Sequence, residues 1–111
     1  MQHRYLGNSG LKISEIIYGN WLTHGSQVED QQAIKTVHAA LDGGITTFDT
    51  ADVYRGGHSE ELLGRAIQAR REAFVVATKI GWIDFDGEAN RSQYDSADKL
   101  VAGVEGSLRR L

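Results

Sequence analysis

The chain has 111 residues and a mass of 12.2 kDa, and its 12 basic and 15 acidic side chains give a formal charge of −3. A protein that binds nucleic acid through bulk charge needs a basic surface, so this balance argues against a nucleic-acid partner. The composition, 41% apolar and 24% charged, is typical of a globular protein and indicates one compact domain.

The sequence contains no cysteine, which excludes disulfide bonds, thiolate metal sites and a cysteine nucleophile. Its apolar runs are far shorter than the roughly 20 residues that a membrane helix needs. Residues 1–12 lack the apolar stretch of a signal peptide. We therefore expect a cytoplasmic protein with no membrane partner.

Residues 1–13 predict a hairpin, because two short strands, 2–6 and 11–13, flank a Gly-Asn-Ser-Gly turn. Beyond it, the chain alternates between short apolar or β-branched runs and segments with apolar residues at helical spacing. The expected strands are residues 15–18, 45–48 and 74–78, of which the first and third have the apolar character of buried strands.

Three helices are expected between and after these strands. Ser26 and Glu29 fit a capping box, in which the Ser26 hydroxyl faces the Glu29 amide at the start of the first helix, and Gly43-Gly44 ends that helix. The second helix is expected over about 59–69. Asp95 or Ser96 can cap the third, in which the apolar residues Leu100, Val101, Val104, Leu108 and Leu111 share a face.

Alternating strands and helices are typical of an α/β fold with parallel strands joined by helical crossovers. We therefore predict a single domain: a hairpin at 1–13 and three β/α units over 15–111. A parallel (β/α)8 TIM barrel needs about 250 residues, so these units match an N-terminal portion of one, and we expect the natural protein to continue past Leu111 by about 200 residues. A small three-layer domain with three strands is the less common alternative.

The carboxyl ends of parallel strands form the functional edge of such folds. Asn20 and Trp21 follow the first strand, Asp49 to Tyr54 the second, and Lys79 the third. At one edge, Asp49 would hold Lys79 in place, and the ammonium would stabilise the charge left when Tyr54 protonates an oxygen as a general acid. The plainer alternatives are a turn cap for Asp49, a loop position for Tyr54 and a solvated strand end for Lys79.

Other polar residues give weaker signals. Glu60 and Glu61 open the second helix, where its dipole favours acids, and the glycines before them fit a loop better than an anion site. Arg55 is most simply a solvated cation. The four histidines, His3, His24, His38 and His58, show no paired ligand spacing, so we predict no metal site.

Two long segments carry a family resemblance. Residues 43–54, GGITTFDTADVY, and 57–64, GHSEELLG, resemble the aldo-keto reductase signature around its catalytic Asp and Tyr. Residues 77–79, Ala-Thr-Lys, resemble the lysine strand of that family, and 5–12 resemble its opening hairpin. Residues 19–27 are most similar to the branch that contains bacterial reductases and the voltage-gated potassium channel β-subunits.

The resemblance implies a (β/α)8 barrel that reduces an aldehyde or ketone with NADPH through an Asp, Tyr, Lys and His tetrad. Asp49, Tyr54 and Lys79 match the first three members, whereas the histidine and the phosphate-binding strands of the family lie beyond Leu111. The positions near the nicotinamide end of NADPH/NADP+ are matched by Asn20, Trp21, Gln27 and Asp49, and the expected substrate contacts are Trp21, Tyr54 and Trp82.

The sequence departs from the family pattern at Arg55, where Gly is frequent, and at Asn20, where many members have Thr. Core packing is the alternative role for Trp21 and Trp82. The partners implied are a small-molecule carbonyl substrate and either a second copy or a complementary C-terminal segment. A regulatory protein resembling the channel β-subunits, or an inactive fragment of the reductase, is the alternative to an enzyme.

Overall fold

The computed structural model describes residues 1–21, 28–81 and 96–111. Its first two strands, β1 (His3–Tyr5) and β2 (Lys12–Ser14), form an antiparallel hairpin in which His3 pairs with Ser14. The turn between them contains Gly7 and Gly10 at φ 52° and 77°, where a Cβ would be strained. The predicted hairpin is confirmed, with its first strand shorter than expected and its second strand shifted by one residue toward the C-terminus.

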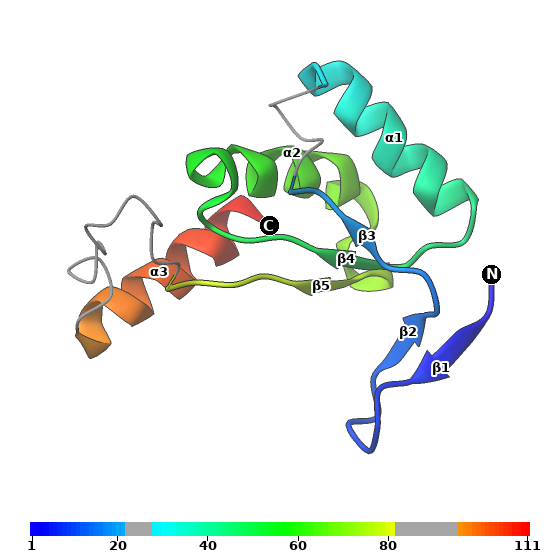
Figure 1. The fold of residues 1–111 in the computed structure, drawn as a ribbon, viewed down its shortest axis with the longest axis horizontal. Coiled ribbons are helices and arrows are strands. Elements are labelled where there is room, and N and C mark those ends of the chain that lie inside the picture. The colour runs from blue at the N-terminus through cyan, green and yellow to red at the C-terminus, as the bar shows by residue number, and fades with distance from the viewer. Residues whose placement is uncertain (22–27, 82–95) are drawn as a thin grey trace.

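Three parallel strands follow, in the order β3 (Tyr18–Gly19), β4 (Thr47–Asp49) and β5 (Val75–Ala77). Gly19 is opposite Asp49, and Asp49 is opposite Ala77. The carboxyl ends of all three strands therefore lie at one edge, on the left of Figure 1. The expected parallel α/β arrangement is confirmed for this part of the chain.

The helices are α1 (Asp30–Asp42), α2 (His58–Ile67) and α3 (Ala97–Arg110), with 3-10 segments η1 (Tyr54–Gly57) before α2 and η2 (Gln68–Ala73) after it. Helices α1 and α2 lie side by side over one face of the sheet (Figure 1). No helix formed by the described residues is long and apolar enough to cross a membrane. The buried core joins α1, α2 and the sheet through Val37, Phe48, Leu63, Ala66, Ile67 and Phe74.

The predicted start of the first helix is wrong. Helix α1 begins at Asp30, and its N-cap is Glu29, whose extended backbone makes no side-chain capping bond. Val28 lies in an isolated β-bridge, so the chain is still extended where the capping box would have placed helix. Ser26 itself falls outside the described residues.

The first predicted strand is also displaced. Residues 15–17 form no strand, and Ile16 and Ile17 are exposed rather than buried. The Ser14 hydroxyl donates to the carbonyl oxygen of Ile16 at 2.8 Å, which bends the chain between the hairpin and β3. Strand β5 is also less buried than predicted in the described part of the chain, because Val75 and Val76 are half-buried and Ala77 is exposed.

Helix α3 starts as predicted, with the Ser96 hydroxyl accepting from the Lys99 amide. Its apolar face is uncovered within the part of the chain that the structure describes, where Val101 and Leu108 are exposed. The buried positions are instead the small residues Gly106 and Ser107. A hollow of about 600 Å³ separates this apolar face from β5 and is lined by residues of both elements, among them Val76 and Val104.

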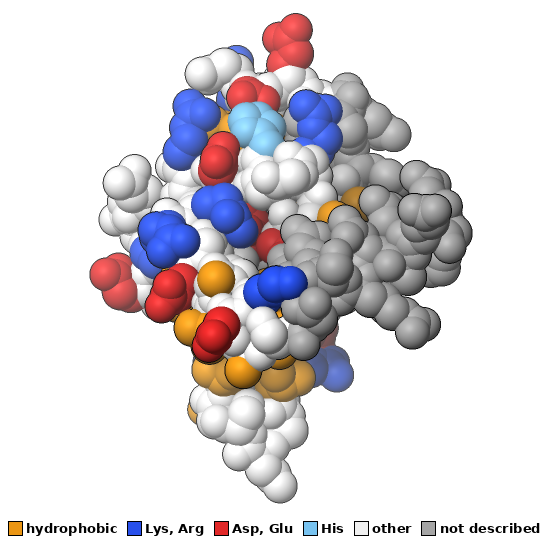
Figure 2. All heavy atoms as spheres, turned by 90° about the vertical axis from the view of Figure 1, so that its left-hand side faces the viewer, with side chains coloured by type: hydrophobic (Ala, Val, Ile, Leu, Met, Phe, Trp, Pro, Cys, Tyr) orange, Lys and Arg blue, Asp and Glu red, His pale blue; other side chains and the backbone are white. Residues whose placement is uncertain are grey.

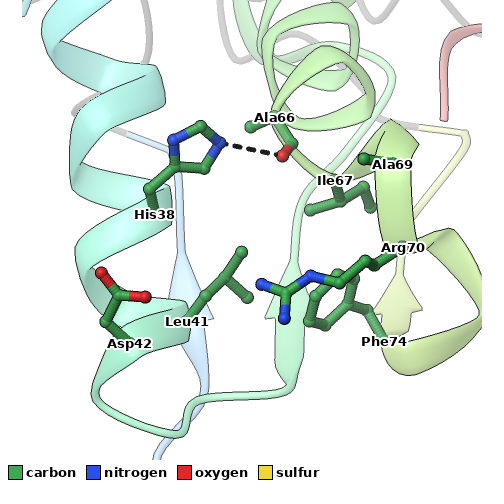
Figure 3. A pocket seen from close by; sticks show the side chains of 8 residues that line it. All are labelled: His38, Leu41, Asp42, Ala66, Ile67, Ala69, Arg70 and Phe74. Carbon is green, nitrogen blue, oxygen red and sulfur yellow. Dashed lines mark hydrogen bonds between the residues drawn. The ribbon is translucent and has the colours of Figure 1, made fainter.

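A second hollow, of about 350 Å³, lies between the C-terminal parts of α1 and α2. Figure 3 shows His38 Nε2 donating to the carbonyl oxygen of Ala66 across this gap, at 3.1 Å, and the Arg70 guanidinium beside the Phe74 ring. These helix ends lie by the amino ends of the strands. The hollow therefore lies away from the edge at which Asp49 and Lys79 sit.

We predict that Gly64→Ala destabilises the fold by about 1–3 kcal/mol, the usual range for overpacking. A Cβ at Gly64 would overlap the carbonyl oxygen of Arg110, which is backbone and cannot swing away. Gly19→Ala is the matched control, because a Cβ there meets nothing within 4 Å, and its effect should stay within about 0.5 kcal/mol. Urea unfolding followed by circular dichroism measures both; equal effects would contradict the close approach of α2 and α3.

A pH dependence follows from the contact between the starts of α1 and α2. His58 Nε2 lies 3.0 Å from Asp30 Oδ1, and its Nδ1 lies 3.3 Å from Glu61 Oε2. Hydrogen bonds to Asp30 and then Glu61 raise the pKa of His58 above 6.5, and the bond to His58 lowers the pKa of Asp30 below 3.8.

The stabilisation from His58 is therefore complete below pH 6.5 and is lost as the pH rises through its raised pKa, whereas that from Asp30 is lost only as the pH falls below 3.8. We expect the urea midpoint of the chain to fall from pH 6 to pH 8, and His58→Gln to flatten this slope. His3→Gln is the control, and a slope unchanged by His58→Gln would refute the assignment.

Candidate active site

The parallel register places two charged side chains together at the carboxyl edge of the sheet. Asp49 ends β4 opposite Ala77, and Lys79 follows two residues later. Lys79 Nζ donates to Asp49 Oδ1 at 2.7 Å and to the carbonyl oxygen of Thr50 at 2.6 Å. Both side chains are about half exposed. The predicted contact between Asp49 and Lys79 is confirmed.

Tyr54 reaches the same pair from the loop after β4. Its ring centroid lies 5.2 Å from Lys79 Nζ, within the range of a cation–π contact. The indole of Trp21, which follows β3, stacks on the Tyr54 ring with centroids 6.3 Å apart. Asp49, Tyr54, Lys79 and Trp21 thus converge from three elements, as the strand order requires.

The backbone after Tyr54 turns sharply into α2. Arg55, Gly56 and Gly57 have φ values of 55°, 63° and 97°, so three successive residues are left-handed. For a residue with a Cβ this conformation costs about 1–2 kcal/mol. Arg55 therefore carries strain that a glycine would avoid, and this strain falls on the residue next to Tyr54.

The electrostatics of the cluster act on Lys79. Burial is the largest single influence and lowers the pKa of Lys79, but the hydrogen bond and charge of Asp49, with smaller contributions from Tyr54, outweigh it and raise that pKa above 10.5. Lys79 therefore stays an ammonium at neutral pH. A fixed cation beside a phenol is suited to stabilise negative charge on the phenol oxygen.

The other predicted contact residues divide into two groups. Asn20 is buried, and its Nδ2 donates to the carbonyl oxygen of Ser59 at 3.2 Å, which ties the end of β3 to the first turn of α2. Trp21 is 62% exposed, so most of its indole is accessible. Gln27 and Trp82 fall outside the described residues, and their roles stay predictions.

Sequence reasoning missed Glu60. It is fully buried, and its carboxylate accepts from Thr78 Oγ1 at 2.6 Å and from Arg110 Nε at 2.6 Å. The helix dipole alone therefore does not explain this acid. Its position in the sequence could have indicated burial, because Glu60 falls on the apolar stripe with Leu63 and Ile67 at spacings of three and seven residues.

The surface at this end of the molecule mixes both charges. Figure 2 views it from the side to which the strands run and shows basic and acidic side chains next to one another.

Within residues 1–21, 28–81 and 96–111, no group of three or more His, Asp or Glu side chains could hold a metal ion.

A comparison with known families shows the class of proteins to which this parallel α/β unit belongs. The sequence model of the aldo/keto reductase family matches residues 15–111, which is most of the chain. The chain belongs to this family.

The relatives are longer than this chain. Probable voltage-gated potassium channel β-subunits from Oryza sativa and Arabidopsis thaliana are 39% and 38% identical to it over its whole length, but the match covers only 34% of each. The chain thus spans about a third of the curated relatives that it matches.

Solved structures agree with the fold. An aldo-keto reductase from Bacillus halodurans, solved as the holo form, is 32% identical with a TM-score of 0.81, and all of this chain superposes on 36% of it. A putative aldo-keto reductase from Pseudomonas aeruginosa is 36% identical with a TM-score of 0.80, over 98% of this chain and 42% of that one. The parallel unit described above is therefore a portion of the fold of these reductases.

The charge of Asp49 can be tested directly. We predict that Asp49→Asn lowers the pKa of Lys79, because burial then acts against the ammonium with only Tyr54 opposing it. The chain has four lysines, so the side-chain carbon signals of 13C-labelled lysine can follow each titration separately. The Lys79→Met variant identifies the Lys79 signal, because that signal disappears from its spectrum. The other three lysines are internal controls; an unmoved Lys79 titration would show that Asp49 does not pair with it in solution.

Proposed function

We propose that this chain supplies the proton-donating part of the active site of an NADPH-dependent carbonyl reductase built on a (β/α)8 barrel. The observation that carries the proposal is the Lys79 ammonium, which lies between the Asp49 carboxylate and the Tyr54 ring at the carboxyl edge of the sheet. Membership of the aldo/keto reductase family supports it. The substrate class is an aldehyde or ketone, reduced to an alcohol.

The roles of the residues follow from their contacts. Tyr54 donates its phenolic proton to the carbonyl oxygen of the substrate, because it is the acid whose remaining charge Lys79 is placed to stabilise. Asp49 keeps Lys79 charged and fixes its ammonium through the 2.7 Å contact. NADPH, when bound, would supply a hydride to the carbonyl carbon, so that with the proton from Tyr54 the product would gain one hydride and one proton.

The residues at this edge suit the nicotinamide end of the cofactor. Trp21 offers an accessible aromatic face next to the Tyr54 ring, and a flat heteroaromatic ring can lie on such a surface. Asn20, Trp21, Gln27 and Asp49 are the proposed cofactor contacts. Trp21, Tyr54 and Trp82 are the proposed substrate contacts, because apolar walls around one polar group are typical of small-molecule sites.

The proposed barrel requires a partner segment beside β5. This strand is at the edge of the described sheet, and the hollow of about 600 Å³ next to it is flanked by the exposed apolar face of α3. A further strand followed by a helix would pair with β5 and cover that face. We propose that this complementary segment, rather than a second copy, is the partner.

A regulatory role is the second candidate, because two relatives are described as probable potassium channel β-subunits. The Asp49, Tyr54 and Lys79 cluster does not separate the two functions. A turnover assay does: the chain alone should oxidise no NADPH with a generic aldehyde, whereas the chain joined to the C-terminal two thirds of a relative should do so. A folded, cofactor-binding barrel without turnover would favour the regulatory role.

In the complete barrel, we predict that Tyr54→Phe lowers kcat by about 10²-fold to 10⁴-fold, the range for lost general acid catalysis. The substitution removes the transferable proton and keeps the ring that contacts Trp21. The dissociation constant for NADPH, measured by fluorescence quenching, should change little. Tyr5→Phe, on the exposed hairpin, is the matched control. Near-normal turnover by Tyr54→Phe would show that the proton comes from another group.

A further inference from the structure

A buried ion pair between Glu60 and Arg110 lies in the helix layer and contacts Thr78, the residue before Lys79. Glu60 is fully buried in the first turn of α2, and its two carboxylate oxygens have different partners. One accepts from Thr78 Oγ1 and the other from Arg110 Nε, each at 2.6 Å. A buried carboxylate costs free energy unless its oxygens are paired, and here both are.

The packing around Arg110 shows that this arrangement is built into the fold. A Cβ at Gly57 would lie 3.1 Å from Arg110 Nε, and one at Gly106 would lie 3.2 Å from its Nη1. Both distances are tighter than ordinary contacts, so the two glycines make room for the guanidinium. The Arg110 side chain is held there by its bonds to Glu60 and to Ser107 Oγ, and its bond to Glu60 in turn restrains that carboxylate.

Thr78 connects this pair to the proposed active site. It lies between the end of β5 and Lys79, and successive side chains of an extended segment point to opposite sides. The Thr78 hydroxyl contacts Glu60 in the helix layer, whereas the Lys79 ammonium contacts Asp49 at the sheet edge. Fixing the Thr78 side chain thus limits rotation of the backbone that aims Lys79.

We propose that Glu60 and Thr78 are positioning residues: their hydrogen bond, held by Arg110, orients Lys79 toward Asp49 and Tyr54. This hydrogen bond restrains the chain after β5, which is an edge strand and has a neighbouring strand on only one side in the described sheet. The backbone beyond β5 is also held by the Asp52 amide, which donates to the carbonyl oxygen of Lys79 at 3.0 Å. The consequence for catalysis rests on the proposed function, but the orientation of Lys79 does not.

The first test uses this chain and the lysine titration. Thr78→Val keeps the β-branched shape and removes the hydroxyl, so the pKa of Lys79 should fall toward or below 10.5 as its contact with Asp49 loosens. Thr78→Ser restores a hydroxyl and should restore the wild-type titration. Thr36→Val is the matched control, because the Thr36 hydroxyl bonds only within α1, to the Gln32 carbonyl oxygen. An unchanged titration in Thr78→Val would overturn the proposal.

A second hydroxyl-free variant, Thr78→Ala, guards against a folding defect peculiar to valine. Thr78 is exposed, so neither substitution should unfold the chain. If the two variants lower the melting temperature but leave the Lys79 titration unchanged, Thr78 has a structural role only and the proposal is wrong.

The part assigned to Glu60 is tested by a double-mutant cycle. If Glu60 acts on Lys79 through Thr78, then Glu60→Ala with Thr78→Val should shift the Lys79 titration no further than Glu60→Ala does alone. Additive shifts would separate the two residues and overturn that part.

In the complete barrel, Thr78→Val should lower kcat by about 10-fold to 100-fold, the cost of a small misplacement of a catalytic group, with the aldehyde KM changed less than about 2-fold. A wild-type barrel without carbonyl reduction would refute the proposed function alone, because the titration still decides whether Thr78 and Glu60 orient Lys79.

Discussion

The register of the parallel sheet is the constraint on which the proposed site depends. Because Gly19, Asp49 and Ala77 are opposite one another, the residues that follow β3, β4 and β5 emerge at one edge. A shift of β5 by one residue would turn Lys79 to the helix side, since side chains alternate along a strand. The contact between Lys79 and Asp49 is therefore a property of strand pairing as much as of the two residues.

Contacts from helix α2 to the strand ends help to hold that register. Asn20 donates to the carbonyl oxygen of Ser59, and Thr78 donates to the carboxylate of Glu60. Two neighbouring residues in the first turn of α2 thus contact the ends of both outer strands. This turn begins directly after the left-handed run that leads away from Tyr54. One short segment consequently relates the position of Tyr54 to those of the strand ends.

The sequence predicted the order of the elements and the contact between Asp49 and Lys79, because periodicity and strand order are local signals. The predictions from sequence were wrong where contacts between residues far apart in the chain determine the structure. The bend at Ile16 depends on the Ser14 hydroxyl, which also accepts from the amide of Thr46, 32 residues away in the chain. Burial of β5 was expected from its apolar character alone, yet in the described structure Val75 and Val76 are half-buried and Ala77 is exposed. Glu60 was missed because its partners, Thr78 and Arg110, are 18 and 50 residues away.

At Arg55 the sequence departs from the family pattern, in a turn whose backbone conformation favours glycine. The family pattern that this sequence resembles frequently has glycine directly after the tyrosine, and here Arg55 at that position has φ 55°, which glycine adopts at little cost. Gly56 and Gly57, which complete the turn, are also left-handed, and a Cβ at Gly57 would lie 3.1 Å from Arg110 Nε, so the start of α2 lies close against that side chain. The first turn of α2 also carries Glu60. The turn that places Tyr54 and the hydrogen bond proposed to orient Lys79 therefore both depend on residues 54–60.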